Sequence, residues 1–334
     1  MRYIILGAGQ AGFAAAKTIR DNSPEAEILV FDQDPAGLYA RMRLPEFVAG
    51  LLPEAKLILS DENAFKAMGI EPHFGVKVTA VRRDAHRIET EDGEKFSYDK
   101  LIFATGADAF VPPVKGLDQV ESFTLRTLSD ARKIAAKAGG DGCSALVIGG
   151  GLLGLEIAWA LRQRGFTVTV AEYMNRLLPR QLNEAQSAVL LEKLGTLELR
   201  IKLGVSLESA EPCGDGRVRT HFSDGSAEEC SLLLFSAGIR SRISLAAEAG
   251  LETARAIKVD HRLRTSDPDI YAAGDCAEID GVTPGLWLAA RDQGTALGKI
   301  LTGKQESFEL PVYTPVLKIG GIRLKDICRE AAQN

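Results

Sequence analysis

The sequence predicts an α/β chain with two parallel sheets, each covered on both faces, and a short C-terminal extension. A strand-like apolar run, glycines spaced G-x-G-x-x-G and a helical apolar pattern occur twice, at 3–22 (YIILGAGQAGFAAAKTIRDN) and at 145–165 (ALVIGGGLLGLEIAWALRQRG). Each copy is followed by a second strand and later by a hairpin pattern and a buried strand that ends in glycine. Alternating strands and helices are typical of parallel sheets, and the repeated layout indicates two homologous domains.

The elements follow in the same order in both repeats. In the first, we expect a strand at 2–6, a helix at 10–22 and a strand at 27–31, followed by an acidic cluster. In the second, the strand starts at 144, the helix covers 152–163, and a strand at 167–171 ends at Glu172. Glycine-containing turns predict antiparallel hairpins around Asp92-Gly93, Gly214-Asp215-Gly216 and Asp224-Gly225. Pro112-Pro113 is the expected crossing between the domains.

Composition narrows the function classes. The chain has 334 residues, enough for two or three domains, and a formal net charge of −5, whereas a nucleic-acid binder is expected to be basic. No apolar run approaches the length of a membrane span. The first residues imitate a secretory signal, but fixed glycine spacing and a continuing helix favour a folded element. The five cysteines and four histidines are scattered, without metal-site spacing. We therefore expect a cytoplasmic protein with reduced thiols and no metal.

The glycine spacing has a physical meaning. The first glycine permits the tight turn, the second lets a pyrophosphate approach the backbone, and the third lets the helix pack closely on the sheet. The helix N-terminus then offers free N–H groups to the phosphates. One such motif alone is weak evidence, but here both copies lie between a strand and a helix. They predict two dinucleotide sites; the alternative is that one copy only packs helix on strand. The glycines are Gly7, Gly9, Gly12, Gly149, Gly151 and Gly154.

Acidic residues after the second strands bear on which dinucleotide binds. A carboxylate at this position accepts hydrogen bonds from ribose hydroxyls and repels a 2′-phosphate. Glu172 therefore predicts NADH rather than NADPH, although Arg176 and Arg180 follow closely and could weaken this preference. In the first repeat the position falls among Asp32, Gln33 and Asp34, which spacing alone does not resolve.

Further motifs resemble the pyridine nucleotide–disulfide oxidoreductase superfamily. They are KLIFATGA at 100–107, IYAAGDCAEI at 270–279, and, in order, GGGLLGLEIAWAL, TVTVAE, LLPRQL and LLLFSAGIRS. The resemblance covers roughly 1–303. It implies two Rossmann-like three-layer domains, with FAD in the first and NAD(P)H in an inserted second. The implied boundaries are 1–109 and 240–305 for the FAD domain, 110–239 for the NAD(H) domain, and 306–334 for a remnant of a C-terminal interface domain.

The resemblance also implies site residues. Gln33 or Asp34 would meet the adenosine ribose, Thr105 and Gly106 would close over FAD, Asp275 would hold its ribityl or pyrophosphate part, and the helix after Gly285 would point its N-terminus at the flavin. The expected FAD residues are Gly7, Gly9, Gln10, Ala11, Gly12, Asp32, Gln33, Asp34, Arg41, Val78, Ala104, Thr105, Gly106, Gly274, Asp275, Leu286 and Trp287. Structural alternatives are a plain strand-ending turn for Thr105-Gly106, a helix cap for Asp275 and a core position for Trp287.

In the second domain, Glu156 would meet the nicotinamide end and Gly238 would line its cleft. The expected NAD(H) residues are Gly149, Gly151, Leu152, Leu153, Gly154, Glu156, Glu172, Tyr173, Ala237 and Gly238.

The segment at 37–50, GLYARMRLPEFVAG, indicates the branch of the family. Disulfide reductases carry redox cysteines here, and this segment has none, so no thiolate is available to attack a disulfide. The pattern Y-x-R-x-R-L-x-E is similar to NADH:rubredoxin oxidoreductases and to the flavin part of nitrite reductases. In those, Arg41 would contact FAD, and Glu46, where relatives often have lysine, is a candidate catalytic residue. Arg41 and Arg43 are alternatively surface charges.

The expected function is electron transfer from NADH through FAD to a rubredoxin-like iron protein or a larger electron-transfer subunit. The alternatives are an NADH oxidase or diaphorase, or a flavin-bearing subunit or redox-sensing partner protein. An acidic partner predicts a local basic surface. The C-terminal PVYTPVLKIGGIRLKDICREAAQN resembles only the start of the family's C-terminal domain. We expect one or two strands and a short helix there, and no oligomeric state follows from the sequence.

Overall fold

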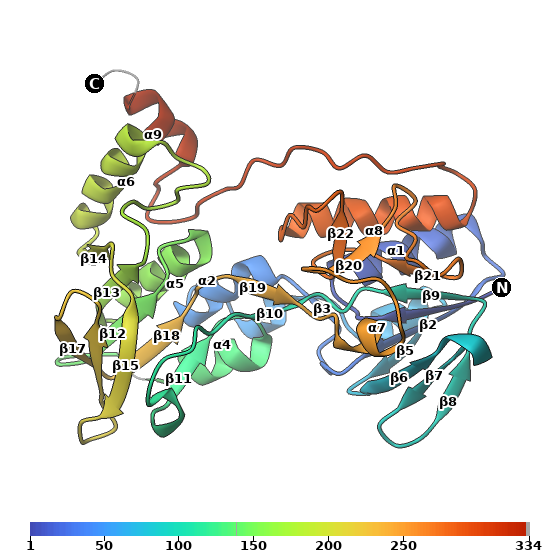
Figure 1. Cartoon of the computed structure of the whole chain (residues 1–334), viewed down its shortest axis with the longest axis horizontal. Helices are drawn as coiled ribbons and strands as arrows, with labels where there is room; N and C mark the ends of the chain where they lie inside the picture. The colour runs from blue at the N-terminus through green and yellow to red at the C-terminus, as the bar shows by residue number, and fades with distance from the viewer. Residues whose placement is uncertain (138, 332–334) are drawn as a thin grey trace. The chain divides into compact units, whose positions relative to one another are not determined.

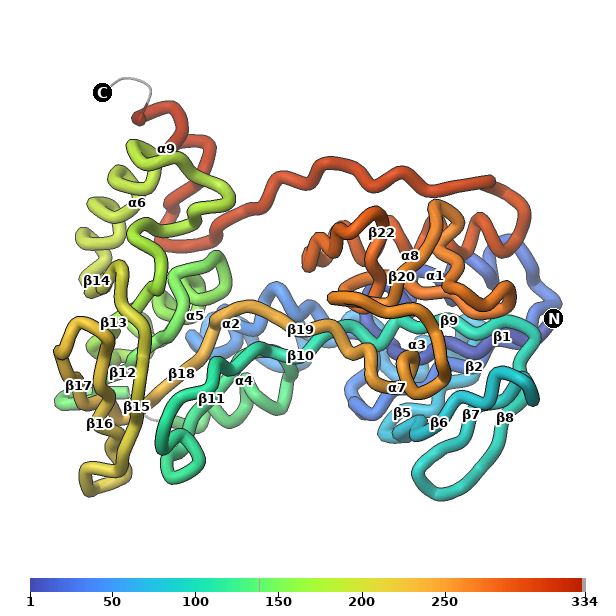
Figure 2. The backbone as a smooth tube through the Cα atoms, in the orientation of Figure 1, coloured from blue at the N-terminus to red at the C-terminus, as the bar shows by residue number. Residues whose placement is uncertain are grey.

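The computed structural model describes residues 1–137 and 139–331 as two compact units. Unit 1 consists of Met1–Ala40, Ile58–Asp108 and Ile239–Tyr313. Unit 2 consists of Arg41–Leu57, Ala109–Gly238 and the described part of Thr314–Asn334. The chain therefore passes between the units repeatedly, as the backbone trace in Figure 2 shows. One passage follows Asp108, a few residues before the expected crossing at Pro112-Pro113.

Unit 1 is built on a five-stranded parallel sheet in the order β21-β9-β1-β2-β5 (Figure 1). A three-stranded antiparallel sheet, β6-β7-β8, accompanies it. The elements of unit 1 are β1 (Arg2–Leu6), α1 (Gln10–Asn22), β2 (Glu27–Asp32), β3 (Leu38–Tyr39), β4 (Ile58–Ser60), α3 (Glu62–Ala67), β5 (Glu71–Phe74), β6 (Val78–Arg82), η3 (Arg83–Ala85), β7 (Arg87–Thr90), β8 (Lys95–Ser97), β9 (Lys100–Phe103), β10 (Ala107–Ala109), β19 (Ile239–Ser241), α7 (Ser244–Glu248), β20 (Ile257–Val259), β21 (Ile270–Ala272), β22 (Ala277–Ile279) and α8 (Trp287–Leu301).

The central residues of the parallel strands β1, β2 and β9 of unit 1, such as Ile4, Val30 and Ile102, are apolar because both faces of the sheet are covered. Tyr3 and Ile5 of β1 pack with α1 and α8 on one face. Ile4 and Leu6 pack on the other face with residues of the antiparallel sheet. Successive side chains of a strand point to opposite faces, so a continuous apolar run fills two cores. This is a three-layer arrangement, as expected for the first domain.

Unit 2 repeats the plan with the parallel order β11-β18-β12-β13-β14 and the antiparallel sheet β15-β16-β17. β12 and β13 correspond to β1 and β2, and β18 corresponds to β9. The elements of unit 2 are η1 (Arg41–Arg43), α2 (Leu44–Val48), η2 (Glu54–Lys56), η4 (Leu117–Gln119), β11 (Ser122–Thr124), α4 (Leu128–Ala135), β12 (Ser144–Ile148), α5 (Leu152–Gln163), β13 (Thr167–Glu172), α6 (Glu184–Thr196), β14 (Leu199–Leu203), β15 (Leu207–Pro212), β16 (Val218–Phe222), β17 (Ala227–Cys230), β18 (Leu232–Phe235) and α9 (Leu324–Glu330).

The C-terminal residues differ from the expectation in one respect. The expected short helix is confirmed as α9, but no strand lies within the described residues 306–331. The prediction of a strand there is wrong because an extended segment becomes a strand only when a neighbour accepts its backbone hydrogen bonds. Around Lys318 the side chains still alternate between buried and exposed, as they do in a strand.

Candidate functional site

The outer glycines of the first turn are required by the fold itself. Gly7 has φ of +115°, and a Cβ on it would lie 2.2 Å from the carbonyl oxygen of Ala104. A Cβ on Gly12 would lie 1.9 Å from the carbonyl oxygen of Gly7. No side chain fits at either position, because real Cβ atoms do not come this close to a backbone oxygen. The turn between β1 and α1 therefore needs both glycines whether or not a ligand binds.

The outer glycines of the second turn are constrained in the same way. Gly149 has φ of +116°, and its Cβ would lie 2.4 Å from the carbonyl oxygen of Ser236. The Cβ of a residue replacing Gly154 would lie 2.0 Å from the carbonyl oxygen of Gly149. The two turns thus use the same geometry, each against the end of the neighbouring parallel strand.

The middle glycines are different. A Cβ on Gly9 or on Gly151 would meet no protein atom within 4 Å. Their backbones are extended, with φ of −65° and −74°, which any residue adopts. The fold therefore does not require glycine at these two positions. Each lies at the N-cap of its helix, where free N–H groups bind phosphate. The space beside Gly9 and Gly151 is therefore open to a ligand, and pyrophosphate binding there stays a prediction.

The acids at the ends of β2 and β13 orient the glycine turns. Asp32 accepts hydrogen bonds from the backbone N–H of Ala8 at 2.7 Å and from that of Asp34 at 2.9 Å. Glu172 accepts from the N–H of Gly150 at 2.6 Å and from that of Met174 at 2.8 Å. Asp32 is therefore the structural counterpart of Glu172, a choice among three residues that the sequence left open.

The other two members of the acidic cluster have different environments. Asp34 accepts hydrogen bonds from the Ala36 N–H at 3.0 Å and from the Tyr39 hydroxyl at 3.0 Å, so it stabilises the turn after β2. The side chain of Gln33 is exposed. Contact of Gln33 or Asp34 with a ribose remains a prediction.

Two further expected FAD residues, Gly274 and Asp275, follow β21, and Gly274 lies against Ala11 at the start of α1. Gly274, with φ of +85°, lies so close to Ala11 that its Cβ would come 2.9 Å from the Ala11 Cβ. Its N–H donates to Oε1 of Gln293 at 2.6 Å, and Gln293 is only 1% exposed. The Ser241 hydroxyl donates to the carbonyl of Asp275 at 2.6 Å. Gln293 was not among the residues expected from the sequence, where its signal is a lone amide on the buried face of the apolar helix α8.

The remaining expected FAD residues of unit 1 divide into two groups. The carbonyl of Ala104 lies beside Gly7, and the hydroxyl of Thr105 donates to the carbonyl of Arg242 at 3.0 Å, so the Thr105-Gly106 turn lies beside the glycine turn. Leu286 and Trp287 begin α8, where Trp287 is partly buried against the core on the α1 face. Val78 instead packs with the core under the antiparallel sheet, on the other face.

Arg41 and Glu46 belong to unit 2, whereas the sequence grouped them with the first domain. α2 packs on α4 and α5, and Leu44 and Val48 are buried there. Glu46 forms a bidentate pair with Arg43, with its Oε2 2.7 Å from the Arg43 Nη2. The Arg43–Glu46 pair explains the position of the Glu46 carboxylate without a ligand. The roles assigned to Arg41 and Glu46 stay predictions.

Glu156 lies in the second turn of α5, and its carboxyl is unusual. Burial is the main cause that raises its pKa, to about 7 from 4.5, and the negative charge of Glu46 adds to the effect. The backbone N–H of Lys318 donates to its Oε1 at 3.0 Å and opposes the shift. A carboxyl with this pKa changes its charge near neutral pH, which is typical of functional sites.

The other expected NAD(H) residues surround the second turn. The N–H of Ala237 is next to Gly149, and Gly238 has φ of +105° with open space around its Cα. Leu153, in the first turn of α5, is exposed, and Tyr173 after β13 is 73% exposed. Apolar side chains exposed beside a phosphate-binding turn are suited to cover a planar adenine ring.

The cysteines offer no redox thiol near the first turn. Cys276 is the one cysteine of unit 1, and it is completely buried. Its Sγ donates to the carbonyls of Phe103 and Ala273 at 3.4 Å. Burial raises the pKa of its thiol. It therefore stays protonated and structural.

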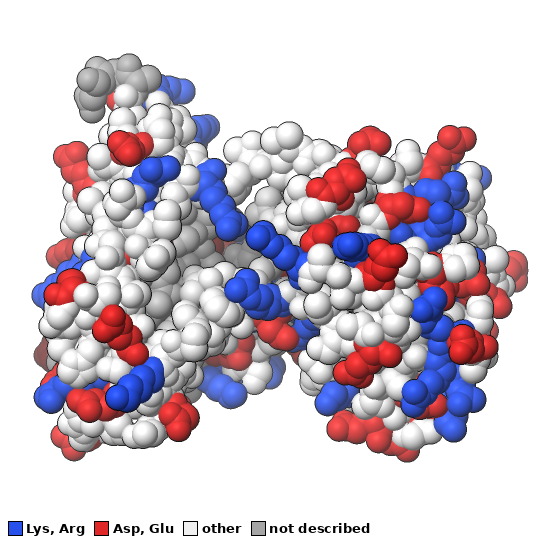
Figure 3. All heavy atoms as spheres, viewed as in Figure 1, with Lys and Arg blue, Asp and Glu red and all other residues white. Residues whose placement is uncertain are grey.

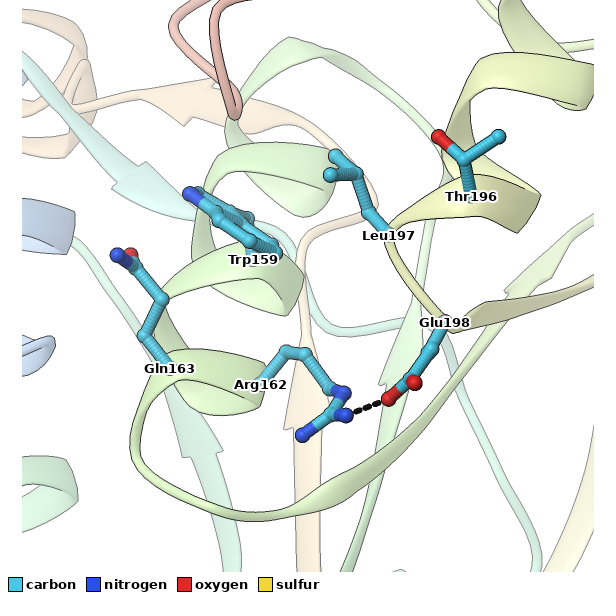
Figure 4. A pocket seen from close by; sticks show the side chains of 6 residues that line it. All are labelled: Trp159, Arg162, Gln163, Thr196, Leu197 and Glu198. Atoms are coloured by element: carbon cyan, nitrogen blue, oxygen red, sulfur yellow. Dashed lines mark ion pairs between the residues drawn. The ribbon is translucent and has the colours of Figure 1, made fainter.

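A hollow of about 340 Å³ lies at the other end of α5. Figure 4 shows its lining, in which Arg162 forms an ion pair with Glu198 beside Trp159. Trp159 is eight residues past Gly151, or roughly 12 Å along the helix. This hollow is separate from the phosphate-binding end of α5 and does not belong to the dinucleotide site.

Comparison with family models gives a match that spans both glycine turns. The model of the pyridine nucleotide-disulphide oxidoreductase family matches residues 1–294. The chain belongs to this family. Membership confirms the expected fold class and, at the level of the family, the expected cofactors FAD and NAD(H).

Two curated relatives of this chain have different names and different lengths. The chain is 33% identical to a rubredoxin-NAD(+) reductase of Alcanivorax borkumensis over 316 residues, which are 94% of this chain and 82% of that protein. It is 36% identical to the nitrite reductase [NAD(P)H] large subunit of Klebsiella oxytoca over 329 residues, 96% of this chain. The chain spans only about a third, 33%, of the length of that subunit.

A solved structure has the same architecture. The NADH:rubredoxin oxidoreductase of Clostridium acetobutylicum superposes with a TM-score of 0.80 at 27% identity, covering 96% of this chain and 80% of that one. Among the described residues, none of the helices has the length and apolar character needed to cross a membrane. Acidic and basic side chains are interspersed over the face shown in Figure 3, so the expected basic surface does not stand out there.

Proposed function

We propose that this chain is an FAD-dependent NADH oxidoreductase that passes electrons to a small iron protein such as rubredoxin. The carrying observation is the pair of glycine turns, each with a middle glycine that the fold does not need. Two bound dinucleotides, one at each turn, would account for both middle glycines. When bound, NADH supplies a hydride, and FAD converts that two-electron donor into single-electron steps.

FAD is assigned to unit 1 and NAD(H) to unit 2. The family's order of domains supports this assignment, as does the second observation that Gly274 and Gln293 reinforce the first turn. In this role Asp32 and Glu172 each hold the glycine turn through one carboxylate oxygen. The remaining lone pairs of the carboxylates can accept hydrogen bonds from ribose hydroxyls.

The environment of Glu172 supports NADH over NADPH. Its carboxylate is oriented by two backbone N–H groups beside the turn, where it would repel a 2′-phosphate. Arg176, one of two cations that could weaken this preference, is turned to its own loop: Nη2 lies 3.5 Å from the Pro179 carbonyl oxygen and Nη1 3.7 Å from the Glu184 carboxylate. A guanidinium held in this way is not directed at a ribose phosphate.

A small iron protein is the preferred acceptor. A disulfide substrate would need a thiolate near the flavin, and the cysteine of unit 1 is buried and protonated. The likeness to rubredoxin reductases supports a one-electron acceptor. We place the activity in the cytoplasm, because unpaired cysteines are typical of that compartment. This chain matches only 33% of the length of the nitrite reductase large subunit. That partial coverage favours a second candidate function, a flavin-bearing part of a larger electron-transfer assembly.

The first experiment tests the donor side. The purified holoprotein is mixed anaerobically with one equivalent of NADH, and the visible absorbance of the flavin is followed; NADPH is the matched control. We expect fast bleaching with NADH and slow bleaching with NADPH. Equal rates would refute the role given to Glu172. No bleaching with either would refute the NADH oxidoreductase function for this chain alone.

The second experiment tests the acceptor. Reduced protein is mixed with oxidised rubredoxin, with air-saturated buffer, or with a small dye. We expect rubredoxin to be reduced much faster than oxygen. Faster oxygen consumption would instead identify an NADH oxidase, and turnover with the dye alone would favour the subunit of a larger assembly.

A further inference from the structure

The carboxyl of Glu156 is held by a residue that is distant in sequence. The backbone N–H of Lys318 donates to Glu156 Oε1 at 3.0 Å across 162 positions of the chain. Lys318 lies in residues 314–331, here called the C-terminal segment, which is part of unit 2 together with α5. Nothing in the β1–α1 repeat corresponds to this contact, because the residue equivalent to Glu156 there is Ala14.

The C-terminal segment is anchored on both sides of Lys318. Leu317 and Ile319 are buried, while the Lys318 side chain between them is exposed. The Cα of Gly320 lies close to Leu197, since a Cβ there would come 2.9 Å from its Cδ1. The buried neighbours fix the direction of the Lys318 peptide N–H, and they leave its ammonium in solvent.

The end of the segment is anchored as well. α9 packs on α6, with Ile327 completely buried, as Figures 1 and 2 show for the two helices. Lys193 of α6 and Glu330 of α9 form an ion pair at 2.8 Å. The position of the Lys318 N–H is therefore set by a docked element rather than by a loose tail.

We propose that Lys318 is a positioning residue for the nicotinamide group: its backbone N–H holds one oxygen of Glu156 so that the other oxygen is free to accept the nicotinamide carboxamide. This inference rests on the proposed function, because it assumes that NAD(H) binds at the second turn. A carboxylate has two oxygens and about four acceptor positions, so one N–H leaves room for a second donor. The segment then supports the nicotinamide end and does not compete for it.

The backbone contributes more than the lysine charge. The Lys318 N–H is the larger of the two effects by which this residue favours the charged form of Glu156, and the ammonium is the smaller. The groups of other elements that act on this carboxyl are Lys318 and, from α2, Glu46, which opposes ionisation. Removing the N–H should therefore matter more than removing the charge.

The test compares Lys318→Pro, which lacks the N–H, with Lys318→Ala, which keeps it and lacks the charge. NAD+ and ADP-ribose are titrated into each oxidised holoprotein by calorimetry. ADP-ribose shares every group of NAD+ except nicotinamide. We expect Lys318→Pro to weaken NAD+ binding about tenfold, as for a lost hydrogen bond to a charged group, and to leave ADP-ribose unchanged. Lys318→Ala should change NAD+ binding less than about twofold.

Measuring NAD+ affinity as a function of pH adds a second test, because a purely structural role of Lys318 would not change the pH dependence of binding. Carboxamide recognition needs the charged carboxylate, so NAD+ binding to the wild type should strengthen as pH rises through about 7, the pKa of Glu156. In Lys318→Pro this midpoint should move to higher pH, and in Glu156→Gln the pH dependence should disappear.

Several results would overturn the inference. Tighter NAD+ binding by Lys318→Pro would mean that the segment competes with nicotinamide, and equal weakening of NAD+ and ADP-ribose would mean that it supports unit 2 as a whole. If Lys318→Pro does not fold, Ile319→Ala loosens the segment beside Lys318; unchanged NAD+ binding there refutes the inference. A wild type that binds neither ligand refutes the proposed function, and the inference with it.

Discussion

The two glycine turns have the same backbone and differ by one methylene group in two places. In the first, Ala8 lies between the glycines and the shorter acid Asp32 accepts its N–H. In the second, Gly150 lies there and the longer Glu172 accepts its N–H. A Cβ on Gly150 would lie 3.1 Å from the Glu172 Oε2 and 2.6 Å from the Leu177 Cδ2. Glycine at position 150 is therefore required chiefly by Leu177 and, to a smaller extent, by Glu172, which approaches through both its Cβ and its Oε2.

The two helices that follow the turns also differ. α1 is covered by α8, which comes so close that a Cβ on Gly294 would lie 2.2 Å from the Ala11 carbonyl oxygen. α5 is instead contacted by α2 and, at Glu156, by Lys318. The helix after the first turn is therefore covered by a glycine-lined helix contact, and the helix after the second by the short helix α2 and by the N–H of Lys318. The close contact of α1 with α8 would suit a cofactor that stays bound. The contacts of α5 would suit a cofactor that exchanges.

The largest expected effect is the replacement of an outer glycine. Gly12→Ala or Gly154→Ala would place a Cβ 1.9 or 2.0 Å from a carbonyl oxygen, so each should destabilise its unit by about 3 kcal/mol or more. Urea unfolding of each variant measures this loss. A change below about 1 kcal/mol would show that the turns relax easily and that the shared geometry is not a requirement.

Replacement of a middle glycine should affect binding and spare stability. Gly9→Ala should lower flavin retention, and Gly151→Ala should weaken NAD+ binding, each by about a hundredfold or 2.7 kcal/mol, because the added Cβ would occupy the space that the proposed function gives to a pyrophosphate. Unfolding of the apoproteins should stay within about 0.5 kcal/mol of wild type.

The variants Gly9→Ala and Gly151→Ala also distinguish the FAD site from the NAD(H) site. Flavin content and calorimetric NAD+ titration are measured on both variants, each serving as the control of the other. Loss of flavin in Gly151→Ala with retention in Gly9→Ala would reverse the assignment of FAD and NAD(H) to the two units.

A third difference is the titratable carboxyl in α5. The pKa of Glu156 is raised to about 7 in the folded protein from 4.5, so its contribution to stability is complete below pH 4.5 and is lost as pH rises through 7. Relative to Glu156→Gln, the wild type should lose on the order of 2 kcal/mol between pH 5 and pH 8. Urea unfolding at both pH values tests this. A parallel pH dependence of the two proteins would show that the carboxyl is not buried.

Local patterns predicted the turns, because a strand, a glycine turn and a helix are encoded by neighbouring residues. The bounds of the helices at 10–22 and 152–163 agree with the structure. Contacts between distant segments were not predictable in this way. Asp32 was one of three adjacent candidates until its hydrogen bond to Ala8 identified it. Neither Gln293 nor Lys318 has a local pattern, since each acts through a contact that exists only after the chain has folded.

The smallest expected effect concerns the exchanged methylene group. Gly150→Ala should destabilise the protein by about 1–2 kcal/mol, because the added Cβ presses on the side chains of Glu172 and Leu177. Adding Glu172→Asp shortens the acid to the length found in the first turn, and it should recover at most about half of that loss, because the contacts with the Leu177 Cδ2 and with the Cβ of residue 172 remain. Glu172→Asp alone should change stability little, because on the same backbone the shorter Asp32 reaches the equivalent N–H of Ala8 at 2.7 Å. A double-mutant cycle by urea unfolding measures the coupling, expected to be about 1 kcal/mol. Additive effects within about 0.3 kcal/mol would mean that acid and turn residue vary independently, and that the resemblance of the two turns is limited to their glycines.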